Sequence, residues 1–331
     1  MATLDIGTPE SQLAYTTRRP GVVAGRFSAQ LDAVDRMAAS LIQNLNTSPA
    51  REAALYHLNT GGHRMRARLA LASAAGWLDG NDAIAAAAAC ELLHNASLIH
   101  DDISDRDTYR RGQPTVAARY GDDVALCAGD LLLTAAFQAA ASIGHAEAAR
   151  QLTSAMARCA ARVIGGQSVE LERSEGEWPV GFRTYLQATR DKTAPLIEAA
   201  LCVGSDAMGG AKAARTPDLR GLAESIGLAY QILDDLDDLG DSNLVAPATD
   251  RLLHPLHAWW HHRPWPRQSG TETATPTRHR CLRHVEAALA RAERLTADLS
   301  APLAESVREL TGQLTQKAKA YRDQALPLNG N

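Results

Sequence analysis

The sequence predicts an all-α protein, and three of its properties carry that prediction. Alanine and leucine are abundant in a chain of 331 residues that is 45% hydrophobic, and both residue types favour helices. Runs of Val, Ile, Tyr and Thr, which are typical of strands, are scarce. Apolar residues instead recur at spacings of three and four, the period of a helix with one buried face.

The first half of the chain contains helical segments separated by clear breaks. Apolar residues line one face of 27–45, and the Ser-Pro pair that opens 48–58 suits a helix N-terminus. The sequence NTGGH then interrupts the pattern, which resumes over 64–78. Residues 82–102 are apolar on almost every side, so we expect this helix at the centre of a bundle.

The second half continues the pattern around one irregular segment. We expect further helices over 123–142, 145–173, 181–204, 218–239, 279–298 and 301–324. Residues 242–278 contain several prolines and no sustained period, so we interpret them as an irregular insertion. The helices on either side are alike, which favours a single helical domain over 26–331. Residues 1–25 mix polar residues, Gly and Pro, and we expect a flexible tail.

Composition argues against several other classes of protein. The net charge of -4 and the pI of about 6.3 disfavour a nucleic-acid partner, which usually requires a basic surface. No stretch reaches the roughly 18–20 uncharged apolar residues of a transmembrane helix, and the N-terminus lacks the apolar core of a secretory signal. The five cysteines show no CxxC spacing, so we expect reduced thiols in a cytoplasmic protein.

Two aspartate clusters each follow an apolar helical run. They are Asp101, Asp102 and Asp105 in LIHDDISD, and Asp234, Asp235 and Asp238 in YQILDDLDD. The spacing places each cluster on one helix face, near the negative end of the helix dipole. A solvated helix end would explain either cluster alone, but two at the ends of buried-looking helices favour divalent cations. Carboxylates suit Mg²⁺, which also binds substrate phosphates, so we predict two acidic walls that hold a diphosphate through magnesium.

Basic residues near the helix breaks could supply further charge for a diphosphate. They are His63, Arg64 and Arg66 in GGHRMR, Arg110 and Arg111 in RRG, and Lys192 beside the Thr193 hydroxyl in RDKTAP. Arginine forks suit phosphate oxygens, and lysine acts as a point charge. Each could be a surface residue, but their grouping favours phosphate binding. His94 lies two helical turns before Asp101 on the same face, where a ligand-binding role and a packed core position both stay open; His100 is expected to be structural.

Six segments of the chain together resemble the trans-isoprenyl diphosphate synthases, also called the polyprenyl synthetase family. They are GGHRMR, ELLHNASLIHDDISDRDTYRRGQPT, AGDLLLTAAF, GGQSVELE, YLQATRDKTAPLIEAA and YQILDDLDD, within roughly residues 50–240. The resemblance implies an all-α bundle around a deep central cavity, usually a homodimer. Two or three Mg²⁺ ions would bridge the aspartate motifs and an allylic diphosphate. The allylic C–O bond ionises, isopentenyl diphosphate attacks the carbocation, and a proton is lost.

The resemblance also assigns roles to individual residues. It implies that both aspartate motifs are metal ligands and that the catalytic residues are Asp101, Asp102, Lys192, Asp234 and Asp235. Arg110 matches the arginine that contacts the allylic diphosphate. Groups that line the same site are matched by Lys192, Thr193 and Gln231. Gln167 matches the glutamine of the family's GQ motif.

The isopentenyl diphosphate side of the site departs from the family pattern. Arg66, His94 and Arg111 match groups that hold this substrate, but His63 stands where the family usually has the lysine of GGKR. Histidine can donate a hydrogen bond to phosphate, yet it carries full charge only when protonated. We therefore expect weaker or pH-dependent binding of isopentenyl diphosphate, and a substrate-binding role for His63.

A second departure follows the second aspartate motif, where the family usually has a Gly-Lys pair and a GKxTLP segment. This chain reads SNLVAPATDRLLHPLHAWWHH, in which Arg251 could replace the lysine. Its Trp and His residues at 259–262 are expected in a partly ordered loop. A terpene-cyclase-like enzyme and a weakly active or non-catalytic subunit therefore stay open as alternatives. A carboxylate-bridged di-iron bundle needs repeated Glu-x-x-His pairs, and only ELLH at 91–94 fits.

The length of the product is predicted from residues that precede the first aspartate motif. In the family, bulky aromatic residues at the positions of Ala96 and Ser97 stop chain growth at fifteen carbons. The small side chains here leave room for a longer product, and Phe137 on the next helix is a candidate floor of the cavity. We therefore expect a geranylgeranyl or longer product.

Overall fold

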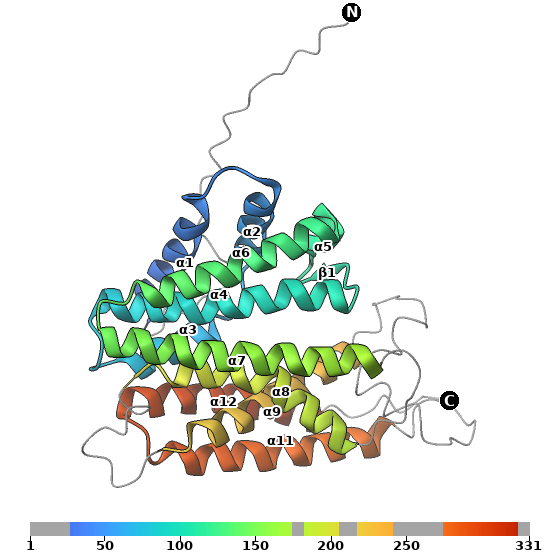
Figure 1. Ribbon diagram of the computed structural model, residues 1–331. Coiled ribbons are helices and arrows are strands. Elements are labelled where there is room, and N and C mark those ends of the chain that lie inside the picture. Colours follow the sequence, from blue (N-terminus) through green and yellow to red (C-terminus); the bar gives the residue numbers. More distant parts are fainter. Residues whose placement is uncertain (1–26, 174–181, 205–216, 241–273, 324–331) are drawn as a thin grey trace, which may run out of the picture.

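The computed structural model is a helical bundle, as predicted, and it describes residues 27–173, 182–204, 217–240 and 274–323 (Figure 1). The helices of the first half are α1 (Ser28–Gln43), α2 (Pro49–Asn59), α3 (Met65–Ala74), α4 (Gly80–Ser104), α5 (Val116–Tyr120) and α6 (Asp122–Ala141). Those of the second half are α7 (Ala146–Arg173), α8 (Phe182–Leu201), α9 (Leu219–Gly240), α11 (Ala274–Thr296) and α12 (Ala301–Asp323). Two short strands, β1 (Tyr109–Arg110) and β2 (Gln113–Pro114), form an antiparallel hairpin after α4.

Local sequence chemistry explains several helix starts. The Ser48 side chain accepts a hydrogen bond from the Arg51 N–H, and Pro49 is the first helical residue of α2. Asp79 accepts two backbone N–H bonds at the start of α4. At the start of α5, the Thr115 hydroxyl oxygen accepts one hydrogen bond, from the Ala118 N–H. Each cap satisfies backbone donors that the first helical turn leaves unpaired.

The centre of the bundle is α4, as its apolar sequence predicts. Its alanines from Ala85 to Ala89 are buried, and it packs against α1, α3 and α6. The small side chains let neighbouring helices approach closely. Helices α8, α9 and α11 form the adjoining part of the bundle, with α9 packed against both α8 and α11 (Figure 1). Helix α8 also contacts α4, so it packs against both helices that carry the aspartate clusters.

Three features of the fold differ from the sequence-based expectation. The hairpin and the short helix α5 were not predicted, because two-residue strands and a five-residue helix are too short to show a period. Helix α11 begins at Ala274, so the last residues of the expected insertion 242–278 are helical; Pro276 is tolerated because it lies in the first turn. The expected tail 1–25 and residues 242–273, with Arg251 and the aromatic residues at 259–262, lie outside the described residues.

Within the described ranges, α6 is the helix that has the length and composition to cross a membrane. Buried helices in globular bundles meet the same criterion, and α6 packs along α4. Its eight buried residues include Leu132 and Gly129. This feature is therefore weak support for a membrane span.

Candidate active site

The first aspartate cluster lies at the C-terminus of α4. Asp101 and Asp102 are in the last turn, and Asp105 is the C-cap residue. Arg106 ends the helix with a positive φ of 56°, a conformation typical of helix C-termini. The helix end is fixed against α6, because the His100 ring packs directly over Gly129 and its Nε2 atom lies 3.4 Å from Asp130 Oδ1. A side chain larger than hydrogen at Gly129 would displace this ring.

Lys192 of α8 faces the first cluster. Its Nζ atom lies 3.6 Å from Asp101 Oδ1 and 3.5 Å from Asp105 Oδ2. Asp102 turns to the other side, where Arg110 Nε donates to its Oδ1 atom at 2.6 Å. The predicted acidic wall therefore exists, and two of the predicted basic residues are in direct contact with it.

The second cluster is connected to α8 by the next residue along the chain. The Thr193 hydroxyl donates to Gln231 Oε1 at 3.0 Å, and Gln231 Nε2 donates to Asp235 Oδ1 at 2.8 Å. Gly227 makes this approach possible, because a Cβ there would lie 3.2 Å from the backbone nitrogen of Ala194. Adjacent residues of α8 are thus linked to both acidic clusters, Lys192 directly and Thr193 through Gln231. Asp238 belongs to α9, but its side chain lies outside the described residues.

Burial makes the carboxylates of both clusters harder to ionise. It raises the pKa of Asp102 to about 6, against the opposing effect of Arg110. The pKa of Asp101 is raised by burial in spite of Lys192, and that of Asp234 is raised by burial in spite of Lys317. The cationic side chains present therefore only partly compensate the acidic walls. Additional positive charge would favour ionisation of all three carboxylates.

The residues of the two clusters fit a hard divalent cation. Asp102 Oδ2 is buried and has no hydrogen-bond partner within the described part of the chain, and the other available donors are also carboxylate oxygens. Over the same residues, no three His, Cys, Asp or Glu side chains are arranged to hold a metal ion. Lys192, Arg110 and Gln231 contact the carboxylates instead, so these side chains would rearrange on metal binding.

A cationic cluster lies beside the first acidic wall. Its members are Arg66, His94, Arg110 and Arg111. Burial and the neighbouring arginines hold the pKa of His94 well below its usual value. Burial and then Arg64 and Arg110 lower the pKa of Arg111. Arg66 Nε and His94 Nδ1 are buried donors or acceptors without a partner among the described residues. The three closely spaced arginines, with the uncharged His94 ring beside them, are suited to an anion.

The hairpin places the two arginines of RRG on this cluster. Arg111 and Gly112 form its two-residue turn with φ values of 54° and 72°, as expected for the tight turns of hairpins. The Arg111 guanidinium donates to the Gly61 carbonyl, and a Cβ at Gly62 would lie 2.8 Å from it. The Arg111 guanidinium therefore packs against the backbone of the double glycine. His63, the predicted substitute for the family lysine, is exposed next to it.

The remaining predicted positions lie on α4, α6 and α7. Gln167 Oε1 is buried without a partner in the described ranges, next to Gly166, which packs on Asp191 of α8. Ala96 is buried, and the Ser97 hydroxyl donates to the His94 carbonyl at 2.8 Å. Phe137 is half-buried on α6. The predicted chain-length role of Ala96, Ser97 and Phe137 stays a prediction.

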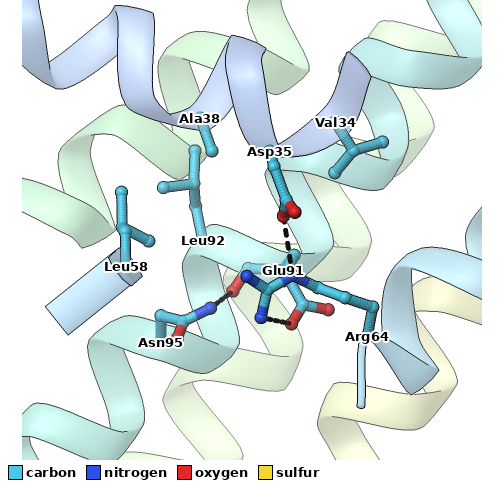
Figure 2. A pocket seen from close by; sticks show the side chains of 8 residues that line it. All are labelled: Val34, Asp35, Ala38, Leu58, Arg64, Glu91, Leu92 and Asn95. Atoms are coloured by element: carbon cyan, nitrogen blue, oxygen red, sulfur yellow. Dashed lines mark hydrogen bonds and ion pairs between the residues drawn. The ribbon is translucent and has the colours of Figure 1, made fainter. Parts of the chain in front are cut away.

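Arg64 was expected among the phosphate-binding candidates, and this was wrong. Its side chain is 6% exposed and points into the bundle, where it pairs with Asp35 and Glu91 (Figure 2). A small pocket lies beside these ion pairs, between α1, α2 and α4. The pocket is therefore separate from the aspartate clusters. Asp35 could not be identified from the sequence, because nothing in α1 indicates a distant arginine.

Helix α12 contributes a further cation that sequence reasoning missed. Lys317 forms an ion pair with Asp237, and the Tyr321 hydroxyl donates to the same carboxylate. Asp237 lies inside the DDLDD sequence but outside the predicted metal set. Lys317 also opposes the burial-driven rise in the pKa of Asp234. Lys317 lies far along the chain from Asp237, so no local pattern in the sequence indicates this contact.

Comparison with known proteins relates the chain to one family. Residues 48–245 match the family model described as polyprenyl synthetase, which is more than half of the chain. A short chain isoprenyl diphosphate synthase of Methanocaldococcus jannaschii is 40% identical over 164 residues, covering 49% of this chain and 49% of the relative. Geranylgeranyl pyrophosphate synthase 7 of Arabidopsis thaliana is 32% identical over 246 residues, covering 70% of both.

A solved structure shares the fold over most of the chain. The geranylgeranyl pyrophosphate synthetase from the archaeon Geoglobus acetivorans superposes with a TM-score of 0.67 at 25% identity. The alignment covers 86% of this chain and 98% of that structure. The sequence match to the Methanocaldococcus relative, by contrast, spans about half of the relative's length.

Proposed function

The chain belongs to the polyprenyl synthetase family, and from this premise we propose that it is a magnesium-dependent prenyltransferase. Its substrates are isopentenyl diphosphate and an allylic diphosphate, and its product is a longer prenyl diphosphate. One observation carries the proposal: adjacent residues of α8 are linked to both acidic clusters, Lys192 by ion pairs with Asp101 and Asp105 and Thr193 through Gln231, which donates to Asp235. This shared link to α8 supports a single site built from both clusters.

The acidic side of this site holds the allylic substrate. Magnesium would be held by Asp101, Asp102 and Asp105 on α4 and by Asp234, Asp235 and Asp238 on α9. When bound, it would supply positive charge that stabilises the departing diphosphate. Lys192 and Arg110 already contact the first cluster, so their charges lie where the leaving group develops its negative charge.

The cationic side holds isopentenyl diphosphate. Arg66, Arg111 and His94 bind its diphosphate, with His63 at the exposed rim of the double glycine. The allylic C–O bond breaks with its electron pair on the diphosphate oxygen, which leaves an allylic carbocation. The double bond of isopentenyl diphosphate then forms the new C–C bond, and a proton is lost from the adjacent carbon. The burial of Arg66, Asp102 and Asp235 would help to keep water from the carbocation.

We further propose a product of twenty carbons or more, formed by a cytoplasmic homodimer. The small side chains of Ala96 and Ser97 before the first cluster support this range, as do relatives named geranylgeranyl and geranylfarnesyl diphosphate synthases. Leu126 on α6 is 52% exposed and would be covered by a second copy. The five unpaired cysteines are consistent with a reducing compartment.

Product analysis tests the function directly. Purified protein is incubated with Mg²⁺, isopentenyl diphosphate and each allylic primer in turn, and products are identified by mass spectrometry. Longer prenyl diphosphates support the proposal. Cyclised hydrocarbons would instead indicate the terpene-cyclase alternative, and absence of any product would indicate a non-catalytic subunit. Asp102→Asn and Asp235→Asn should each abolish turnover, because each removes a carboxylate from one acidic wall.

A further inference from the structure

The loop between the double glycine and α3 contains an arginine in a strained conformation. Arg64 is the N-cap residue of α3 and has φ 54° and ψ 32°, the left-handed region that residues other than glycine rarely adopt. Its side chain is 6% exposed. Strain of this kind persists only where surrounding contacts hold the residue in place. The contacts of the Arg64 side chain therefore decide the course of this loop.

Two carboxylates from different helices hold the Arg64 guanidinium (Figure 2). Asp35 of α1 accepts from Arg64 Nε at 2.6 Å, and Glu91 Oε1 of α4 lies 3.7 Å from Nη1. The side chain of Asp35 is 13% exposed and that of Glu91 is 7% exposed. Removing one partner of such a buried ion pair strongly destabilises the fold, because the other charge stays buried without compensation. The loop is thereby fixed to both α1 and α4.

Glu91 also replaces the missing cap of α3. An arginine side chain carries no hydrogen-bond acceptor, so Arg64 cannot cap the helix it precedes. Glu91 Oε2 accepts from the Ala67 N–H at 3.3 Å, the third residue of α3. The Glu91 main-chain carbonyl in turn accepts from Asn95 Nδ2 at 2.7 Å. The start of α3 is therefore oriented by a side chain of α4.

The segment that is held in this way carries the cationic side of the site. Arg66 lies one residue inside α3 from Met65, and the double glycine lies just before Arg64. Gly62 packs against the Arg111 guanidinium, where an added Cβ would lie 2.8 Å away. Glu91 also acts electrostatically on Arg66 and on Arg111. Displacement of Arg64 would move both arginines.

We propose that Asp35 and Glu91, acting through Arg64, are positioning residues for the diphosphate of isopentenyl diphosphate. Helix α1 is then part of the support of that subsite, although none of its residues reaches the substrate. This inference rests on the proposed function. It predicts a defect that is specific to one of the two substrates, because Lys192, Thr193 and Gln231 lie on other helices.

The test compares Asp35→Asn with Asp32→Asn. Asp32 is an exposed aspartate one turn earlier on α1, so both variants remove one carboxylate from the same helix. Steady-state kinetics should show a KM for isopentenyl diphosphate raised on the order of tenfold in Asp35→Asn. Its KM for the allylic substrate should stay within about twofold, and Asp32→Asn should match the parent protein. An equal change in both KM values, or no change, would overturn the proposal.

Arg64→Gly and Arg64→Lys separate the backbone from the ion pair. Glycine adopts the left-handed conformation without strain but cannot bind Asp35, so we expect the same substrate-specific defect. Lysine keeps a cation but loses the Nε hydrogen bond, so it should rescue only in part. Full function of Arg64→Gly would show that the ion pairs are dispensable and would refute the inference. Melting temperatures identify variants that fold; if Asp35→Asn does not, Arg64→Lys carries the kinetic test.

Binding measurements distinguish this inference from the proposed function. Calorimetric titration of the unmodified protein with isopentenyl diphosphate reports binding without turnover. If the unmodified protein neither binds nor converts this substrate, the proposed function fails. If it binds, and Asp35→Asn binds with unchanged affinity, the positioning role fails while the function stands. Weaker binding by Asp35→Asn, with Asp32→Asn unchanged, supports both.

Discussion

Replacement of Thr193 by valine should disconnect α8 from the second acidic cluster. The two side chains have nearly the same shape, and Thr193 is 6% exposed, so packing is retained while one donor is lost. Gln231 Oε1 then loses a 3.0 Å hydrogen bond, and the 2.8 Å bond from Gln231 to Asp235 loses its support. Removing a buried partner costs about 1–3 kcal/mol. Gln231 is half-buried, so water can partly replace the donor, and we expect about 1 kcal/mol.

The functional effect of Thr193→Val should exceed its effect on stability. A Gln231 amide that rotates freely no longer fixes the Asp235 carboxylate, which is 2% exposed. We expect kcat/KM for the allylic substrate to fall on the order of tenfold, a loss of about 1.4 kcal/mol in transition-state stabilisation. The KM for isopentenyl diphosphate should stay unchanged. Initial-rate assays with each substrate varied in turn measure the kinetic constants, and denaturant unfolding measures the change in stability.

Three control variants sharpen this prediction. Thr193→Ser keeps the hydroxyl and should restore most of the activity. Thr134→Val makes the same substitution at an exposed position of α6 and should be silent. In a double-mutant cycle, Thr193→Val should add little to Gln231→Leu, because both act on the same bond. Additive effects, or a Thr193→Ser variant as impaired as Thr193→Val, would refute the proposed connection.

Three further predictions concern the support of the site. Gly62→Ala should displace Arg111, since the new Cβ would lie 2.8 Å from its guanidinium; a raised KM for isopentenyl diphosphate checks this, and an unchanged value contradicts it. Burial, followed by the positive charge of Arg111, lowers the pKa of His57 to about 3. Between pH 6.5 and 3, His57 therefore binds a proton in the unfolded chain but not in the folded chain. This residue should therefore reduce the free energy of unfolding by about 1.4 kcal/mol per pH unit as pH falls, and a His57→Gln variant with the parent's pH dependence would contradict it. Gly204→Ala should destabilise the fold by about 3 kcal/mol or more, because its Cβ would overlap the Ser73 carbonyl; thermal unfolding near the parent temperature would show that the helices can separate.

The sequence predicted the helices well because their period is long and their breaks are chemically clear. The predicted end of the central helix near Asp102 agrees with α4 ending at Ser104, and both aspartate clusters lie in the last turns of their helices. The prediction of one shared face was too simple for the first cluster, because Asp102 points toward Arg110 while Asp101 and Asp105 point toward Lys192. Lys192 lies 3.6 Å from Asp101 and 3.5 Å from Asp105, whereas its predicted role at the allylic diphosphate stays a prediction. Local patterns of this kind depend only on neighbours within one or two turns.

Contacts between distant segments could not be predicted in the same way. The periodicity of α1 marks Val34 as a core residue but gives no sign that Asp35 binds Arg64, 29 residues later. The burial of Arg64 reverses its predicted role, because a basic residue next to two glycines looks identical whether it faces substrate or core. Lys317 of α12 was missed for the same reason.

The central claim is that the two aspartate clusters together bind a magnesium diphosphate. A crystal structure of the protein with Mg²⁺ and a non-reactive allylic thiolodiphosphate tests it most directly. We predict metal ions bound by Asp101 and by Asp235, with the diphosphate between α4 and α9 and within reach of Lys192. A diphosphate bound elsewhere, with Lys192 still paired to Asp101 and no metal at either cluster, would contradict the claim.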